Sequence, residues 1–139
     1  MERFDYFLKV LNVIDKKEKY NWSSIPITKI LPSNYENLLN YYDTQIGGNE
    51  KNELYLAFIQ YSYYNYIDEN ESVLFSDYAL IFYIKEGKDF IKSLLLMNSK
   101  EYNTYLLETN KAFESYSLPD VMRKISEKEI NIAELFKDI

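Results

Sequence analysis

The sequence predicts a single α+β domain over residues 1 to 139, with helices at both ends packed on an antiparallel meander sheet. Three observations predict this class. Apolar residues recur at helical spacing near the N-terminus, runs rich in tyrosine, phenylalanine and isoleucine alternate with short turn-forming segments in the middle, and cap residues precede short apolar stretches near the C-terminus. The chain is 47% hydrophobic and has only three glycines and three prolines, so we expect it to fold on its own.

The first element is predicted as an amphipathic helix over residues 3 to 17. Its apolar stripe consists of Phe4, Phe7, Leu8, Leu11 and Ile14. A loop follows, in which Trp22 is expected to pack at the edge of the core.

A second, short helix is predicted over residues 33 to 43. Ser33 and Glu36 have the spacing of a capping box, and an apolar stripe follows: Tyr35, Leu38, Leu39 and Tyr42. We expect Gly47 and Gly48 to end this helix, since glycine permits the left-handed conformation that often closes helices.

The middle of the chain favours extended structure. Residues 54 to 66 fit either a helix or a strand, and their aromatic content slightly favours a strand. Three further strands are predicted over residues 77 to 84, 90 to 97 and 101 to 109.

Two helices are predicted at the C-terminal end. Ser117 is a candidate cap for the segment LPDVMRKI, with Pro119 in its first turn. Ser126 and Glu129 have a second capping-box spacing before INIAELFKDI.

The absence of both cysteine and histidine removes thiolate nucleophiles, imidazole bases and the usual ligands of zinc, copper and haem. The sequence also lacks a calcium loop, a glycine-rich phosphate loop and a nucleophile elbow. We therefore expect no catalytic residues, no cofactor and no metal site. A carboxylate-dependent enzyme stays open as an alternative.

The negative charge is concentrated in one window. The whole chain carries 16 basic and 22 acidic residues, for a net charge of −6, while residues 49 to 80 alone carry six acids against Lys51. That window also holds six of the fifteen tyrosines. An acidic surface repels phosphate backbones, so we expect no direct nucleic-acid binding and instead a basic protein partner.

The candidate partner-binding residues lie in this window. In a strand, Tyr61 and Tyr63 would face one side and Tyr64 and Tyr66 the other, so some must be exposed. The predicted set is Tyr61, Tyr63, Tyr64, Tyr66, Asp68, Glu69, Glu71 and Asp77. A solvated acidic loop is the commonest reading of Asp68, Glu69 and Glu71, followed by an interface and then by a metal cluster.

The segment ILPSNYENLLNYYDTQIGG, from residue 30 to 48, resembles the Leu-Pro-led helix and glycine pair of the SUKH superfamily of bacterial immunity proteins. The later segments ALIFYIKEGKDFIKSLLLM, NTYLLET and SYSLPDVMRKI resemble that family's strand pair, further strand and Ser-led helix. The family usually has a glutamate-bearing helix before its Leu-Pro, which SSIPITK does not supply. The resemblance implies a non-enzymatic protein that neutralises a cognate toxin, often a nuclease.

The predicted function is therefore an immunity-type protein that binds a toxin through an acidic, tyrosine-rich surface. The alternative is a phage-encoded acidic inhibitor or DNA mimic that blocks a nucleic-acid enzyme. No signal peptide or membrane segment is apparent, so a cytoplasmic location without membrane contact is expected. The sequence leaves the oligomeric state open.

Overall fold

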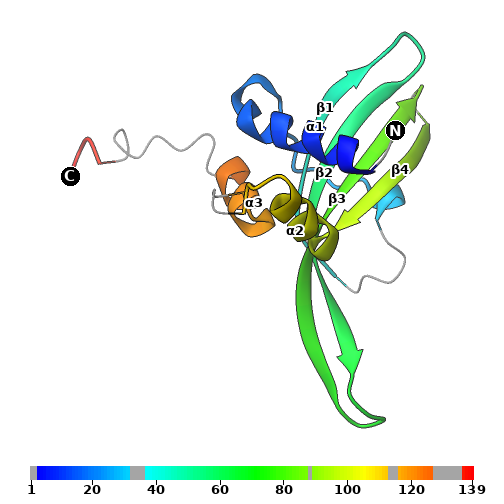
Figure 1. Cartoon of the computed structure of the whole chain (residues 1–139), viewed down its shortest axis with the longest axis vertical. Helices are drawn as coiled ribbons and strands as arrows, with labels where there is room; N and C mark the ends of the chain where they lie inside the picture. Colours follow the sequence, from blue (N-terminus) through cyan, green and yellow to red (C-terminus); the bar gives the residue numbers. More distant parts are fainter. Residues whose placement is uncertain (1–2, 32–36, 88, 113–115, 127–135) are drawn as a thin grey trace.

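The structure is a computed structural model that describes residues 3–31, 37–87, 89–112, 116–126 and 136–139 (Figure 1). Four strands form one antiparallel sheet in the order β1 (Asn37–Gly48), β2 (Glu53–Tyr66), β3 (Ser72–Glu86) and β4 (Phe90–Asn98). The helix α1 (Arg3–Asp15) precedes the sheet, and the helices α2 (Ser99–Glu108) and α3 (Leu118–Ser126) follow it. The chain is thus an α+β domain built on an antiparallel meander, as predicted.

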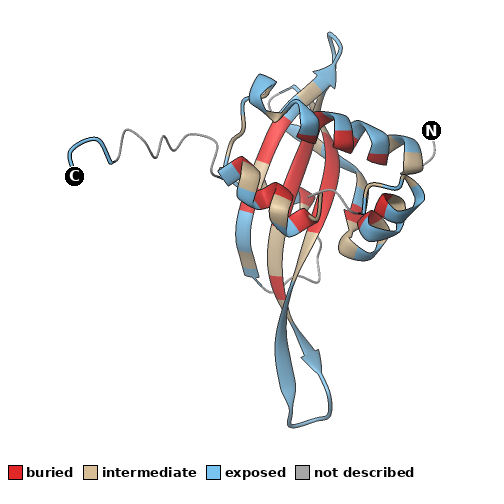
Figure 2. Cartoon of the chain, turned by 60° about the vertical axis from the view of Figure 1, so that its left-hand side comes forward, coloured by how far each residue is buried: buried red, intermediate tan, exposed pale blue. Residues whose placement is uncertain are grey.

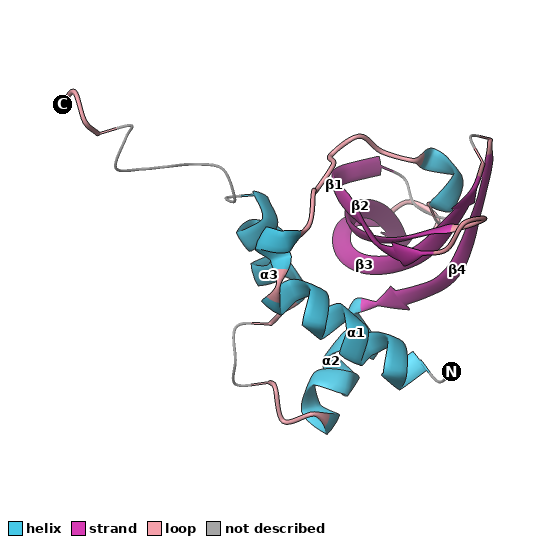
Figure 3. Ribbon diagram, turned by 90° about the horizontal axis from the view of Figure 1, so that it is seen from above, coloured by secondary structure: helices cyan, strands magenta, loops and turns pink. Residues whose placement is uncertain are grey.

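The three α-helices cover one face of the sheet (Figure 3). Leu56 and Phe58 of β2 and Leu80 and Phe82 of β3 point to this face and are buried. They pack with apolar residues of the helices: Phe7, Val10, Leu11 and Ile14 from α1, Tyr102 and Leu106 from α2, and Val121, Met122 and Ile125 from α3. Burial of this layer supplies most of the hydrophobic stabilisation of the domain.

The centre of the opposite face of the sheet is also buried, although none of the described α-helices covers it. The sheet curls (Figure 3), and a segment containing the short 3-10 helix η2 (Thr28–Ile30) packs on this second face. Ile30 contributes to a second apolar cluster with strand residues Tyr41, Ala57, Ile59, Ala79, Ile81 and Tyr83. With both faces covered, the centres of β2 and β3 are continuous buried runs rather than alternating ones.

Several predicted elements are confirmed. The helix over residues 3 to 17 is α1, residues 54 to 66 lie in β2, and LPDVMRKI lies in α3. Ser117 caps α3, because its hydroxyl oxygen accepts a hydrogen bond from the backbone N–H of Asp120 at 3.4 Å. Trp22 packs at the core edge with its ring centroid 5.6 Å from that of Phe58.

The helix predicted over residues 33 to 43 is wrong from residue 37 onward, where the chain forms β1. The predicted stripe of Leu38, Leu39 and Tyr42 suits a helix, but the intervening residues have low helix propensity. Pairing with β2, which begins at Asn37 opposite Ser62, decides the outcome. Gly47 and Gly48 therefore end a strand, and the capping box of Ser33 and Glu36 lies outside the described residues.

The strand predicted over residues 101 to 109 is also wrong, because residues 99 to 108 form α2. Asn98 caps this helix by accepting a hydrogen bond from the backbone N–H of Glu101 at 2.9 Å. Tyr102 and Leu106, four residues apart, are the buried positions of one helical face. The second capping box, Ser126 with Glu129, and most of the helix expected after it lie outside the described residues.

Gly48 is required by the turn between β1 and β2. Its φ is +136°, and a Cβ added there would lie 2.5 Å from the carbonyl oxygen of Asn52. We expect Gly48→Ala to lower the free energy of unfolding by about 2 kcal/mol or more, because the residue is both strained and in steric conflict.

The matched control is Gly47→Ala. A Cβ at Gly47 would have its nearest neighbour, Leu54, at 3.9 Å, an ordinary contact. Urea unfolding of both variants checks the prediction, and equal stability of the two would contradict it.

Candidate functional site

The strands β2 and β3 extend beyond the rest of the sheet as a two-stranded ribbon (Figure 1). The described part of β1 begins its pairing opposite Ser62, and β4 ends its pairing opposite Ala79. We call residues 61 to 77 the arm: the last six residues of β2, the connecting turn and the first six residues of β3. Figure 2 shows that most of the arm is exposed, in contrast to the buried centre of the sheet.

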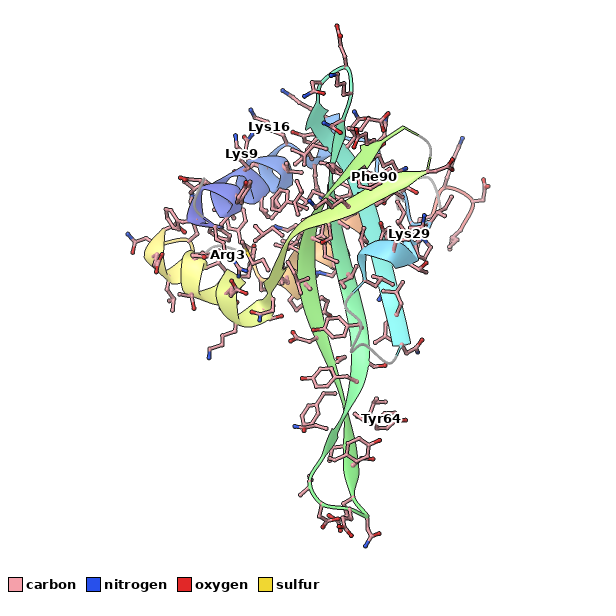
Figure 4. The ribbon with its side chains drawn as sticks, turned by 90° about the vertical axis from the view of Figure 1, so that its right-hand side faces the viewer. Arg3, Lys9, Lys16, Lys29, Tyr64 and Phe90 are labelled. Carbon is pink, nitrogen blue, oxygen red and sulfur yellow. The ribbon has the colours of Figure 1, made fainter. Side chains whose placement is uncertain are left out.

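Large side chains occupy both faces of the arm. On one face the ring centroid of Tyr63 lies 6.0 Å from that of Tyr61 and 5.9 Å from that of Phe75. On the other face Tyr64, Tyr66 and Leu74 are 48%, 72% and 56% exposed. Figure 4 shows Tyr64 on this ribbon, well away from the helices. An exposed apolar surface of this kind is typical of a protein-binding site.

The acidic turn at the tip is stabilised by Asp68. Its carboxylate accepts hydrogen bonds from the backbone N–H groups of Asn70 at 2.7 Å and Glu71 at 2.9 Å. The N–H of Ile67 donates to the carbonyl of Glu71 at 2.9 Å and closes the hairpin. Asp68 therefore shapes the turn, while the side chains of Glu69 and Glu71 are exposed.

Asp77, the last acid of the predicted set, lies where the arm joins the body. Its carboxylate accepts hydrogen bonds from the N–H of Tyr78 at 2.7 Å and from the hydroxyl of Ser99 at the start of α2. Tyr61 lies opposite Asp77 in the ladder, and burial, followed by the charge of Asp77, raises the pKa of Tyr61. Asp77 thus fixes the base of the arm.

The structure brings the predicted residues together on one arm but gives them different environments. Tyr64, Tyr66, Glu69 and Glu71 are exposed, Tyr61 and Tyr63 are half-buried, and Asp68 and Asp77 hold backbone groups.

A buried carboxylate, which the sequence analysis missed, lies on the second face of the sheet. Asp43 is 5% exposed, and one of its oxygens accepts hydrogen bonds from the hydroxyls of Tyr41 at 2.6 Å and Tyr83 at 2.7 Å. In a strand, Tyr41 and Asp43 share a face because they are two residues apart. Because this segment was predicted as a helix, in which residues two apart do not share a face, the pairing of Tyr41 with Asp43 was not predicted. Burial first, and then the hydrogen bond to Asp43, raises the pKa of each tyrosine well above its ordinary value.

Tyr55 extends this cluster toward solvent. Its ring stacks on that of Tyr83 with centroids 4.9 Å apart, and the Lys85 Nζ lies 4.9 Å from the Tyr55 ring centroid. Its hydroxyl donates to Glu53 at 2.5 Å. Partial burial, then this hydrogen bond, raises the pKa of Tyr55 to about 12.

A hollow of about 730 Å³ lies beside Asp43 and Tyr55, at the edge of β1. Asp43 is the single acid among the described residues that line it, and Tyr41 and Tyr83 already donate to that acid. Elsewhere in the described part of the chain, no three acidic residues come close enough to hold a metal ion. None of the described helices has the length and apolar character to span a membrane.

Comparisons with models of protein families, with curated proteins and with solved structures find no match for this chain.

The Asp43 cluster makes a stability prediction. In Asp43→Ala the buried hydroxyls of Tyr41 and Tyr83 lose their acceptor, so we expect the free energy of unfolding to fall by about 2 to 5 kcal/mol. Asp43→Asn keeps one acceptor oxygen and should lose less. Chemical denaturation of the two variants measures the difference, and a loss below about 1 kcal/mol in Asp43→Ala would contradict this role.

The buried tyrosines also predict a dependence on alkaline pH. Burial raises the pKa values of Tyr41, Tyr83 and Tyr102, whereas tyrosines of the unfolded chain titrate near 10. Above pH 10 the unfolded chain releases protons that the folded chain keeps. Stability is therefore full below pH 10 and falls above it, by about 1.4 kcal/mol per pH unit for each buried tyrosine.

Unfolding experiments at pH 9, 10 and 11 measure this decline. The control variant Tyr41→Phe lacks one of the buried titrating tyrosines, so its free energy of unfolding should fall less steeply above pH 10, by about 1.4 kcal/mol per pH unit. Titration of all fifteen tyrosines near pH 10 in the folded protein, followed by tyrosinate absorbance, would be inconsistent with the buried cluster.

Proposed function

We propose that this protein is a non-enzymatic inhibitor of the immunity type, which binds a cognate toxin through the arm. The observation that carries the proposal is the arm itself, a projecting hairpin with large apolar side chains on both faces and an acidic tip.

The stability of the arm supports a binding role. An isolated two-stranded hairpin is only marginally stable in water, and more strands or a packed helix are usually needed to support it. In the arm, Tyr64, Tyr66 and Leu74 continue the helix-covered face of the sheet beyond the described helices, where they are exposed. A partner that covers this face would remove apolar area from water and stabilise the hairpin at the same time.

The charge of the arm supports a basic partner. The arm carries Asp68, Glu69, Glu71 and Asp77, and no lysine or arginine occurs from residue 52 to 84. Such a field steers a basic surface toward the arm and disfavours nucleic acid. Nuclease toxins have basic substrate-binding surfaces, which fits the function implied by the SUKH resemblance.

The resemblance itself gives partial support. The strand pair and the Ser-led helix occur where the resemblance places them, as β3 with β4 and as α3. The helix after the Leu-Pro pair and the further strand do not, since those segments contain β1 and α2. A DNA mimic fits less well, because mimicry needs carboxylates spread along a surface and here three of them gather at one turn.

The test is toxin neutralisation in cells. The protein encoded by the neighbouring reading frame, expressed alone, should arrest growth, and co-expression of this chain should restore it. Substitution of the exposed arm side chains by serine (Tyr64→Ser, Tyr66→Ser and Leu74→Ser together) should abolish the rescue, because hot-spot contacts are lost.

The matched control replaces three exposed apolar residues of β4, Phe90→Ser, Leu94→Ser and Leu96→Ser, which are 51%, 48% and 39% exposed. Figure 4 shows Phe90 at a distance from the arm and Tyr64. The control should rescue growth like the unmodified chain. A neighbouring product without toxicity, or rescue that survives the arm substitutions, would overturn the proposal.

The electrostatic part is tested by Glu69→Lys with Glu71→Lys. Asp68 and Asp77 are left unchanged, because their carboxylates accept hydrogen bonds from backbone N–H groups of the hairpin and their substitution would disturb its structure. Reversal of the two exposed charges should lower the association rate constant for the toxin and make that rate less dependent on salt concentration. The dissociation rate constant should stay nearly unchanged.

A further inference from the structure

The outer edge of β3 in the arm has no neighbouring strand among the described residues. β4 covers this side of β3 only as far as the pair of Ala79 with Asn98, and the chain then turns into α2. From Ser72 to Ser76, the only described strand that pairs with β3 is β2.

The hydrogen-bond pattern shows which groups this edge presents. The N–H of Ile67 donates to the carbonyl of Glu71, so these two residues form a hydrogen-bonded pair. Every second pair of an antiparallel ladder is of this type, and the pairs of Val73 and Phe75 with β2 follow it. The N–H and C=O groups of Ser72, Leu74 and Ser76 therefore point outward.

Tyr78 supports this assignment. It lies two residues after Ser76, so its backbone N–H and C=O groups point to the same edge of β3. Its outward N–H donates to Asp77 at 2.7 Å, and its outward carbonyl lies 3.0 Å from the Ser99 hydroxyl, whose one proton it shares with Asp77. Asp77 and Ser99 thus satisfy the edge where β4 ends. No described residue does the same for Ser72, Leu74 and Ser76, whose side chains are exposed.

This edge lacks the usual protection against strand pairing. Native edges carry lysine, proline, bulges or inward charges, whereas residues 72 to 76 read SVLFS and pair with β2 without a register shift. The sequence is also prone to form strands. The edge is a template for an added strand.

We infer that the edge from Ser72 to Ser76 receives an extended basic segment of the partner as an additional strand. This inference rests on the proposed function and specifies its mode of recognition. Three N–H and three C=O groups supply main-chain hydrogen bonds, and side chains of the added strand alternate between the Tyr64–Leu74 face and the Tyr63–Phe75 face.

The charge of the arm selects a basic segment over a second copy of this chain. Asp68, Glu69 and Glu71 lie beyond one end of the edge and Asp77 beyond the other. A lysine-bearing strand would place its charges between these carboxylates, whereas a second copy would bring its own acids to them.

The test uses a synthetic peptide that alternates lysine and valine, added to the full-length protein and followed by amide NMR. Slowed hydrogen exchange is expected at Ser72, Leu74 and Ser76. An identical peptide with every amide N-methylated offers no N–H donor on either edge and should not bind, and a glutamate–valine peptide should be repelled.

A matched pair of variants tests the edge directly. Ser76→Pro removes one outward N–H, which a strand edge tolerates, and should weaken peptide binding about threefold to tenfold relative to Ser76→Ala. Circular dichroism of both variants verifies that the sheet is retained.

Each other outcome overturns the inference. Equal binding of the N-methylated peptide would indicate simple charge attraction, absence of binding would refute strand addition, and exchange protection that grows with protein concentration alone would identify a second copy as the occupant. Loss of peptide binding with arm-dependent growth rescue intact would refute strand addition alone. Peptide binding without arm-dependent rescue would refute the toxin proposal alone.

Discussion

The pairing of β2 with β3 is the interaction on which the rest of the structure depends. Fourteen consecutive residue pairs, from Glu53 with Lys85 to Tyr66 with Ser72, join the two strands without a register shift. Eight of these pairs lie in the body, and the six from Tyr61 with Asp77 to Tyr66 with Ser72 lie in the arm. Because one register governs both parts, the alternation that buries Phe58 and Phe82 against the helices also determines which faces Tyr63 and Tyr64 occupy in the arm.

The two parts of the ladder differ in what surrounds them. In the body, β1 and β4 flank the central pair, α1, α2 and α3 cover one face, and η2 covers the other. At the junction this cover ends, and Asp77 and Ser99 satisfy the last outward groups. The arm has the same strand-forming, aromatic composition as the body, but the flanking strands and the described helices do not extend over it. A strand sequence with body-like composition that no described residue covers is the physical basis of the proposed binding role.

The sequence predicts those parts of the fold in which one periodicity dominates. The stripe of Phe7, Leu11 and Ile14 could only be a helix, and α3 combined a cap at Ser117 with an apolar face. The segments that became β1 and α2 are compatible with both periods. For α2, the spacing of Asn98 to Glu101 was the missed signal of a helix start. For β1 no local signal decides, because pairing with the already strand-forming β2 overrides the helical stripe.

The candidate site could also be predicted only in part. Charge and composition located the window that holds the arm, since those properties are additive along the chain. The different roles of its acidic residues depend on three-dimensional contacts, which the local sequence does not reveal. Asp68 and Asp77 resemble Glu69 and Glu71 in sequence, yet their shorter side chains reach neighbouring backbone N–H groups and hold the turn and the base of the hairpin. The aspartates thus keep the ladder aligned up to its tip, and this alignment places the exposed glutamates beyond the end of an open strand edge. Recognition through such an edge would draw on the backbone for affinity and on the acidic tip for selection of the partner.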